Sequence, residues 1–252
     1  MSLLEVKELS VKLEDKVILK NLNISLDTGQ VSFLLGRNGA GKTTFAQTLM
    51  GDSKYTLIHG DIYIQDENNE NVEIQSSFID LKPEDRMKLG LFVSFQNPPE
   101  IEGVSLLNFL HTIYVEKFGN EDSLSRSTFK FRKYLLSLLD ILKLDASFLD
   151  RSLNVGFSGG EKKRCEILQI MLLKPTIVIL DEIDSGLDIY ALNILQNAVQ
   201  TLIDQNSTVL YISHNVDFVK KYPNSKIYIL ESGEITLSGG MEVLDAFIQD
   251  KT

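Results

Sequence analysis

The first part of the chain alternates between apolar and polar residues, which is the period of a β-strand with one buried face. Its apolar positions are Leu4, Val6, Leu9, Val11 and Leu13, then Val17 and Ile18, then Leu22, Ile24 and Leu26. Polar residues separate these groups, so the pattern predicts antiparallel strands joined by turns. The stretch from Tyr55 to Ile74 has the same strand-like character, interrupted by a polar loop over Asp66–Asn71.

Short, unbroken apolar runs indicate a different kind of strand, because a strand buried on both faces of a parallel sheet needs no polar positions. The runs expected to form central strands are Val31–Leu35, Leu91–Phe95, Ile177–Leu180 and Val209–Ser213. Helices are expected over Thr43–Met50 and about Ile189–Ile203, with a short helix starting at Pro83. This alternation of strands and helices predicts an α/β fold with a parallel sheet.

Between residues 97 and 173 the apolar positions recur at helical spacing, as in Leu106, Phe109, Leu110, Ile113 and Tyr114. We interpret this stretch as a helical subdomain inserted into the core. The prediction is a single domain over residues 1–252, in which residues 1–96 and 174–252 form the α/β core with its antiparallel part. Near the end, Ile227–Leu230 and Ile235–Leu237 predict a closing hairpin.

Composition limits the binding partners and the cellular location expected for this protein. The formal charge of −10 argues against non-specific binding to nucleic acid. No segment has the roughly 18 to 20 apolar residues of a membrane span, so we expect no direct membrane insertion. The single cysteine, Cys165, can form neither an intrachain disulfide nor a metal site alone, and the start of the chain lacks a secretory pattern. We therefore expect a cytoplasmic protein, with an organelle matrix as the alternative.

The turn after the first central run carries the strongest motif. It reads Gly-Arg-Asn-Gly-Ala-Gly-Lys-Thr, the phosphate-loop pattern, between a predicted strand and a predicted helix. Glycines let successive backbone N–H groups converge on a β-phosphate. Lys42 would contact the β- and γ-phosphates, and the Thr43 hydroxyl would bind Mg²⁺. The expected nucleotide-binding residues are Gly36, Arg37, Asn38, Gly39, Ala40, Gly41, Lys42, Thr43 and Thr44.

Polar side chains follow the other central runs. Asp181 and Glu182 come directly after Ile177–Leu180, while Gln96 and His214 each follow another predicted strand. Because the carboxyl ends of parallel strands form the edge where ligands bind, all of them are expected there. Asp181 would hold Mg²⁺, and Glu182 would polarise or position the attacking water. By themselves, the two acids are explained equally well as turn residues.

A second candidate anion site lies in the helical segment. Residues 157–164 read Phe-Ser-Gly-Gly-Glu-Lys-Lys-Arg, in which Ser158, Gly159, Gly160 and Glu161 would open a helix whose N-terminus attracts a phosphate. Local sequence alone favours a simpler explanation, a capping box between Ser158 and Glu161. One nucleotide does not need two such phosphate-binding segments on the same subunit.

Taken in order, these motifs resemble those of the ABC-type ATPases from end to end. The phosphate loop, Gln96, Ser158–Glu161, Asp181–Glu182, Ser185–Asp188 and His214 match the Walker A, Q-loop, signature, Walker B, D-loop and switch-histidine motifs. The resemblance implies a P-loop NTPase fold with a RecA-like parallel sheet, an antiparallel β subdomain and an inserted helical subdomain.

The resemblance also implies an activity and an assembly. It implies Mg²⁺-dependent hydrolysis of ATP, with Glu182, His214 and Gln96 in catalysis and Thr43, Gln96 and Asp181 at the metal. It implies a head-to-tail homodimer formed with ATP, in which Ser158–Glu161 of one subunit cap the nucleotide held by the other. The aromatic residue on which many members stack adenine has no counterpart near Val11–Leu13.

Within the ABC-type ATPases the chain is most similar to the SufC family, which serves SUF iron–sulfur cluster assembly. The similarity is concentrated in Asn154–Arg164, Glu182–Asp188 and Phe95–Ile101. It implies soluble SufB- and SufD-like scaffold partners in place of membrane-spanning subunits. The expected contact surface is Asn97–Phe118, and the alternative is a rigid loop that only covers its own core.

Two other functions remain open on sequence alone. One is the nucleotide-binding subunit of an ABC membrane transporter. The other is an ATP-gated interaction module with little turnover.

Overall fold

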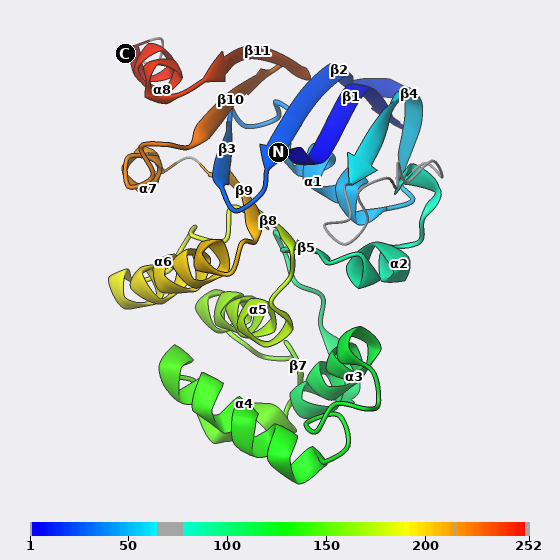
Figure 1. The fold of residues 1–252 in the computed structure, drawn as a ribbon, viewed down its shortest axis with the longest axis vertical. Helices are drawn as coiled ribbons and strands as arrows, with labels where there is room; N and C mark the ends of the chain where they lie inside the picture. The colour runs from blue at the N-terminus through cyan, green and yellow to red at the C-terminus, as the bar shows by residue number, and fades with distance from the viewer. Residues whose placement is uncertain (1, 65–77, 214, 250–252) are drawn as a thin grey trace. The chain divides into compact units, whose positions relative to one another are not determined.

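The computed structural model describes residues 2–64, 78–213 and 215–249 of the chain. They form two compact units (Figure 1). The first comprises Met1–Val93, Thr176–Glu182 and Leu202–Thr252, and the second comprises Ser94–Pro175 and Ile183–Thr201. The fold is the predicted mixed α/β fold with a parallel central sheet.

An antiparallel sheet of order β2–β1–β4 forms one part of the first unit. Its strands are β1 (Ser2–Leu13), β2 (Lys16–Asp27) and β4 (Tyr55–Ile64). The predicted antiparallel strands are thus confirmed, while the continuation of the third over residues 65–74 lies outside the described residues. The apolar period slips by one residue after Val6, and a bulge at Glu8, with φ of +51°, absorbs the slip.

A six-stranded sheet of order β11–β10–β3–β9–β8–β5 forms the other part of this unit. Its strands are β3 (Val31–Leu35), β5 (Leu91–Val93), β8 (Ile177–Asp181), β9 (Thr208–Ile212), β10 (Lys226–Glu231) and β11 (Glu234–Gly239). All neighbours are parallel except the β10–β11 hairpin. Strands β3, β8 and β9 are buried at every position, as their unbroken apolar runs predict.

One predicted central strand ends early. The run Leu91–Phe95 was expected to be strand throughout, but β5 stops at Val93. Phe95 is 38% exposed, and its N–H donates to the Glu166 carboxylate at 2.6 Å. A side-chain acceptor has therefore replaced the sheet as the partner of this backbone, which turns the chain out of the ladder.

The helices of the first unit are short. They are α1 (Lys42–Met50), α2 (Pro83–Lys88), α7 (Val216–Val219), α8 (Met241–Gln249) and a 3-10 turn over Phe78–Asp80. Phe45 and Leu49 of α1 are fully buried in one apolar cluster with both sheets. Helix α8 was not predicted, although Val243, Leu244 and Phe247 give it a buried face.

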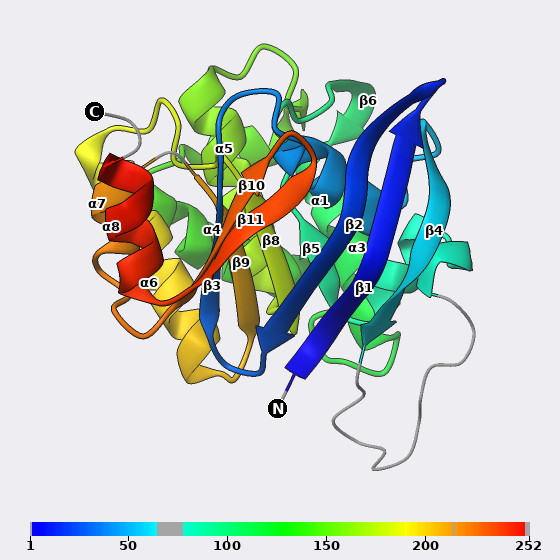
Figure 2. The ribbon, with the colours of Figure 1, turned by 90° about the horizontal axis from the view of Figure 1, so that it is seen from above.

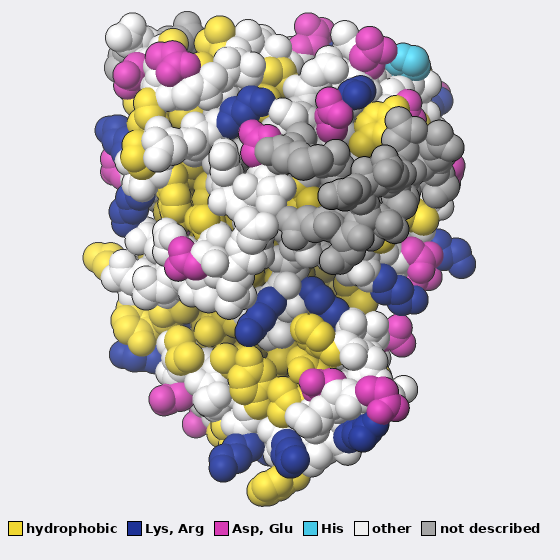
Figure 3. All heavy atoms as spheres, in the orientation of Figure 1, with side chains coloured by type: hydrophobic (Ala, Val, Ile, Leu, Met, Phe, Trp, Pro, Cys, Tyr) yellow, Lys and Arg dark blue, Asp and Glu magenta, His cyan; other side chains and the backbone are white. Residues whose placement is uncertain are grey.

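The second unit is mostly helical, and it includes Ile183–Thr201, which the prediction placed in the α/β core. Its helices are α3 (Leu106–Phe118), α4 (Thr128–Leu142), α5 (Gly159–Leu173), a 3-10 turn over Ala146–Asp150 and most of α6 (Ile189–Asp204). The insert predicted from about residue 97 begins with a strand: β6 (Ile101–Ser105) pairs with β7 (Ser152–Leu153) before Ser105 caps α3. Hydrophobic side chains, yellow in Figure 3, also reach the surface over α3 and α4.

A single buried cation secures the C-terminal end of α1. Arg86 is 3% exposed, and its guanidinium donates to the carbonyls of Thr48 and Leu49 at 2.8 Å each. It also donates to the carbonyls of Ile79 and Leu81, at 2.7 and 2.9 Å. Burial lowers the pKa of Arg86, an effect that the nearby charge of Asp80 opposes. The guanidinium thus satisfies helix-end carbonyls that would otherwise be buried without partners.

Replacing Arg86 with Met is expected to lower the free energy of unfolding by about 3 kcal/mol, because those buried carbonyls lose their donors. The matched control is Arg132→Met, which removes a bidentate pair with Asp150 on the surface, at 2.8 Å for each bond, and should cost far less. Urea unfolding followed by circular dichroism measures both. Equal losses in the two variants would contradict a special role for Arg86.

Candidate nucleotide-binding site

The ends of adjacent parallel strands create a common edge in the first unit. Leu34 of β3 pairs with Ile212 of β9, and Ile212 pairs with Asp181 of β8. The turn after β3 and the last residue of β8 therefore lie side by side at the carboxyl ends of the strands. This is the edge at which open α/β sheets bind ligands.

The phosphate loop, Gly36–Thr43, leaves β3 at this edge and leads into α1 (Figure 1). A Cβ on Gly36 would strike the backbone oxygen of Leu230, and one on Gly41 would lie 2.7 Å from Cδ2 of Leu19. Gly41 also has a φ of +113°, which glycine adopts without strain. The Ala40 N–H donates to the Arg37 carbonyl at 3.1 Å, which closes the loop. Gly36 is thus required by close packing, and Gly41 by close packing as well as by backbone conformation.

The lysine of the loop folds back over it. The Lys42 side chain is 5% exposed, and its ammonium donates to the carbonyls of Gly36 and Arg37 at 2.9 and 3.2 Å. These bonds hold a positive charge across the loop. A cation in this position would attract a phosphate placed in the loop.

Asp181 is a carboxylate in almost complete burial, at 1% exposed. Burial raises the pKa of Asp181 to about 6, and the nearby charge of Glu182 contributes to the rise. A hydrogen bond from the Thr43 hydroxyl and the charge of Lys42 both oppose the rise. The carboxylate, the hydroxyl and the ammonium therefore meet within one small region. The predicted convergence of Thr43 and Asp181 is present in the structure.

Glu182, which follows, has a strained backbone. Its φ is +51°, in the left-handed region that costs a residue with a side chain about 1–2 kcal/mol. The Glu182 N–H donates to the Ile212 carbonyl at 2.9 Å, so the strand pairing holds the residue in this conformation. Strain of this kind, maintained by surrounding structure, is common at functional sites.

The signature segment opens α5 in the second unit. The Ser158 hydroxyl accepts the Glu161 N–H at 3.3 Å, and the Glu161 carboxylate accepts the Ser158 N–H at 2.7 Å. This second bond is the main reason that the pKa of Glu161 is lowered. The capping box is therefore present, and Gly159 and Gly160 lie within it, with no heavy atom within 4 Å of a Cβ built on either.

The remaining predicted residues are not among the described residues of the first unit. Gln96 belongs to the second unit and is exposed, while His214 lies outside the described residues. In the D-loop segment, Asp188 accepts the Ala191 N–H at 2.7 Å at the start of α6 and pairs with Arg164 of α5 at 3.1 Å. The first unit alone thus brings together the phosphate loop, Asp181 and Glu182.

Sequence reasoning missed one contact of the phosphate loop. The Gly233 N–H, in the turn between β10 and β11, donates to the Ala40 carbonyl at 3.0 Å. The sequence did predict this hairpin, but only the strand order of the sheet places its turn against the loop.

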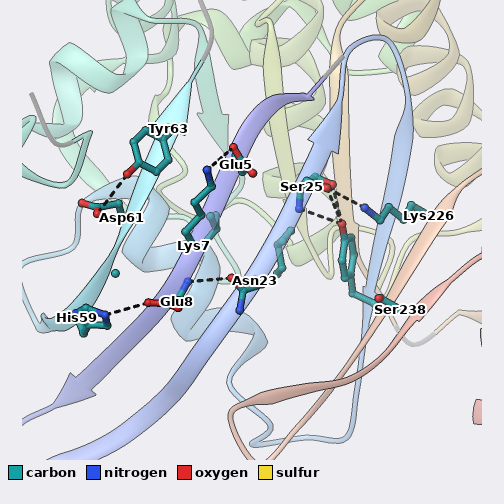
Figure 4. Close-up of a pocket in the computed structure, with 14 residues that line it drawn as sticks. Glu5, Lys7, Glu8, Asn23, Ser25, His59, Asp61, Tyr63, Lys226 and Ser238 are labelled. Carbon is teal, nitrogen blue, oxygen red and sulfur yellow. Dashed lines mark hydrogen bonds and ion pairs between the residues drawn. The ribbon is translucent and has the colours of Figure 1, made fainter. Parts of the chain in front are cut away.

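A separate hollow lies on the face of the antiparallel sheet, with a volume of about 510 Å³ (Figure 4). Four of its side chains form two pairs: Lys7 with Glu5 at 3.2 Å, and His59 with Glu8 at 3.2 Å. None of the residues predicted to bind nucleotide lines it. The strand edge, and not this hollow, therefore carries the chemistry predicted from the sequence.

Comparison with known proteins identifies the family. The family model described as ABC transporter matches residues 19–185. The chain belongs to the ABC transporter family. This ABC ATPase is 38% identical to a Synechocystis protein named probable ATP-dependent transporter slr0075, over 96% of this chain and 91% of that protein. It is 37% identical to the Arabidopsis thaliana ABC transporter I family member 6, chloroplastic, over 94% of this chain and 68% of that protein.

Solved structures agree on the fold of the ABC ATPase. An ATP-binding subunit of an ABC transporter superimposes with a TM-score of 0.77 at 22% identity, covering 98% of this chain and 94% of the other. A dimeric ATP-binding cassette bound to ADP and Pi superimposes with a TM-score of 0.76 at 20% identity, covering 94% and 98%. The family makes the chain an ATP-binding, ATP-hydrolysing subunit, and the solved structures show its P-loop NTPase fold. Among the described residues, no helix has the length and apolar character to cross a bilayer.

The side chains at the strand edge fit a magnesium nucleotide. Mg²⁺ prefers oxygen ligands and keeps several waters, so the Thr43 hydroxyl and the Asp181 carboxylate suit it. Lys42 and the closely packed glycine backbone suit a polyphosphate. A bound cation would also offset the cost of burying the Asp181 charge.

Replacing Asp181 with Asn is expected to raise the free energy of unfolding of the metal-free protein at pH 7.5 by about 1–3 kcal/mol, because a buried charge is removed. The folded-state pKa lies above the ordinary 3.8, so the wild type loses stability as the pH rises between about 4 and 6. The advantage of the variant should therefore shrink at about pH 4.5. Urea unfolding in EDTA tests this, and a difference that does not change with pH would contradict it.

Proposed function

We propose that this ABC ATPase is the energy-coupling subunit of an iron–sulfur cluster assembly scaffold of the SUF type. ATP-driven pairing of two copies would reshape SufB- and SufD-like partners. The proposal rests on contacts within the second unit between two segments that are similar to the SufC family. These segments are Phe95–Ile101 and Asn154–Arg164.

Direct side-chain contacts join these two segments. The Asn154 amide donates to the Pro99 carbonyl at 2.8 Å, and the Lys162 ammonium pairs with Glu100 at 2.6 Å. Asn154 is 4% exposed and has a φ of +61°, a conformation that asparagine tolerates better than most residues. The segment that follows the Q-loop is therefore anchored to the signature segment, and movement of one would be transmitted to the other.

Apolar side chains of the anchored segment face solvent. Phe95, Ile101 and Val104 are 38%, 39% and 37% exposed. A loop that only covered its own core would bury such side chains, so their exposure favours a contact surface. Stiff, exposed apolar residues are typical of a surface that docks a partner.

In the proposed mechanism the phosphate loop binds ATP and Lys42 contacts its β- and γ-phosphates. Thr43, Asp181 and Gln96 would hold Mg²⁺, which when bound neutralises charge on the phosphates. Glu182 would orient and polarise the attacking water, with His214 and Gln96 assisting. These roles are carried over from the family motifs onto the residues of this chain that match them.

The second candidate phosphate-binding segment, Ser158–Glu161, explains why two copies would pair. Ser158–Glu161 of one copy would cap the nucleotide held by the other, because the N-terminus of α5 offers a site for anionic phosphate. The solved cassette bound to ADP and Pi is described as dimeric, which supports this arrangement. Hydrolysis would then remove the shared phosphate and release the pair.

The alternative is the nucleotide-binding subunit of a membrane transporter. Two relatives are named probable ATP-dependent transporters, which favours it. A cytoplasmic location or an organelle matrix would suit either function, and one relative is named as chloroplastic.

Replacing Glu182 with Gln is expected to slow ATP hydrolysis at least about 100-fold and to accumulate an ATP-bound dimer, since binding is kept and water activation is lost. Size-exclusion chromatography with Mg-ATP and with Mg-ADP measures the dimer, and phosphate release measures turnover, with and without scaffold partners. Glu84→Gln, at an exposed position on α2, is the control for charge. Equal turnover in the wild type and Glu182→Gln would instead favour an ATP-gated module.

Replacing both Ile101 and Val104 with Asp is expected to abolish co-purification with co-expressed SufB- and SufD-like proteins, because charge would be placed in an apolar contact. Nucleotide binding should be unchanged. Ile141→Asp, at a 50% exposed position on α4, is the matched control. Co-purification with a membrane-spanning protein in place of the scaffold pair would support the transporter function.

A further inference from the structure

The turn between β10 and β11 is part of the first unit that the proposed mechanism does not use. Strand β10 runs parallel to β3, with Ile229 opposite Leu35. Leu230 therefore lies beside Gly36 at the start of the phosphate loop, as the close approach of their backbones confirms. The turn that follows reaches the loop that leads into α1 (Figure 2).

The turn has a conformation that few sequences permit. Glu231 and Glu234 are the last ladder partners, so only Ser232 and Gly233 form the turn. Their φ angles are +49° and +87°, the combination of a type I′ turn. A Cβ on Gly233 would also strike the backbone oxygen of Ile18. Glycine at position 233 is therefore required both by its φ and by the packing of the turn on β2.

The two polar groups of Gly233 connect different parts of the unit. Its carbonyl accepts the Lys20 N–H of β2 at 2.8 Å. Its N–H donates to the Ala40 carbonyl of the phosphate loop at 3.0 Å. The exposed pair between Lys20 and Glu234, at 3.6 Å, adds little to this by comparison. Gly233 is thus a backbone link between a fixed strand and the phosphate loop.

We propose that Gly233 is a positioning residue that presets the phosphate loop for nucleotide. No cis peptide bond occurs among the described residues, and in a trans peptide the C=O and N–H point in opposite directions. Holding the Ala40 carbonyl on the turn therefore directs the Gly41 N–H away from the turn. In phosphate loops, N–H groups of this segment meet the β-phosphate. The turn thus fixes the direction of the Gly41 N–H, a hydrogen-bond donor to phosphate, before the nucleotide binds. Less free energy is then spent on ordering the loop when the nucleotide binds.

A positioning role and a purely structural role of Gly233 predict different measurements. This inference rests on the proposed phosphate-binding role of Gly36–Thr43. A preset donor acts on bound ATP and ADP alike, because both carry a β-phosphate. Losing it should raise the dissociation constants of both nucleotides and the KM for ATP together, with kcat changed less. A purely structural role would lower the melting temperature and leave nucleotide affinity alone.

The first experiment compares Gly233→Ala with Gly119→Ala. Gly119 has a similar φ of +76°, but a Cβ there meets no heavy atom within 4 Å and it lies in the second unit. Both variants carry the backbone strain, and only the first disturbs the turn. Titration with fluorescent ATP and ADP analogues should show a loss of affinity of about ten-fold or more for Gly233→Ala and none for Gly119→Ala.

The second experiment keeps the test valid if Gly233→Ala does not fold. An ester in place of the peptide bond between Ser232 and Gly233 removes the Gly233 N–H and changes no side chain; the weaker ester carbonyl is common to this variant and its control. The control is an ester between Glu242 and Val243, which removes the Val243 N–H bond to the Gly240 carbonyl, 3.1 Å long, away from the loop. The first ester should weaken ATP and ADP binding about five- to ten-fold relative to the second. Equal affinities in the two esters would overturn the proposal.

A parallel variant, Lys42→Ala, separates this inference from the site assignment on which it rests. If Lys42→Ala binds nucleotide as well as the wild type, the assignment of the phosphate loop fails, and the inference fails with it. If Lys42→Ala loses affinity while the ester at Gly233 does not, the site assignment stands and only the role of Gly233 is overturned.

Discussion

The parallel pairing of β3 with its neighbours β9 and β10 is the constraint on which the candidate site depends. On one side it aligns Leu34 with Ile212 and, through β9, with Asp181, so the carboxylate is brought to the loop that follows β3. On the other side it aligns Leu35 with Ile229, which places the β10–β11 turn against the same loop. A slip of one residue in either pairing would move the loop away from its partners and reverse the faces of the strands. Unbroken apolar runs allow this pairing to be buried on both faces.

Burial also explains why the site is costly to build. A carboxylate at 1% exposure is unfavourable in its charged form, and the rise in the pKa of Asp181 to about 6 expresses that cost. Glu182 adds backbone strain one residue later. The surrounding core tolerates both because β8 is held by ladders on each side. The buried charge and the backbone strain lower the stability of the fold at this strand end. A bound metal and phosphates would offset that loss, as expected for a preorganised site.

The sequence predicted the parts of this protein that depend on local pattern, and it failed where distant segments meet. Predominantly apolar runs predicted the central strands β3, β8 and β9, and the motif with its flanks predicted the phosphate loop. The early end of β5 depends on Glu166, which lies 71 residues away, and β6 depends on pairing with β7. Contacts of this kind leave no periodic signal in one chain. The same reason hid Gly233: its turn was evident in the sequence, but its contact with Ala40 requires the order of the strands.

The capping box at Ser158 and Glu161 shows that a structural and a functional explanation of one motif need not exclude each other. The box satisfies the N–H groups of Ser158 and Glu161, which lets α5 begin at an exposed end. The residues between them are glycines with open space around them, where any side chain would narrow the approach of a ligand. A cap alone would be served as well by alanine at these positions, which is a better helix former. Two glycines at the first turn of a 15-residue helix therefore favour a site that a phosphate of another copy approaches closely.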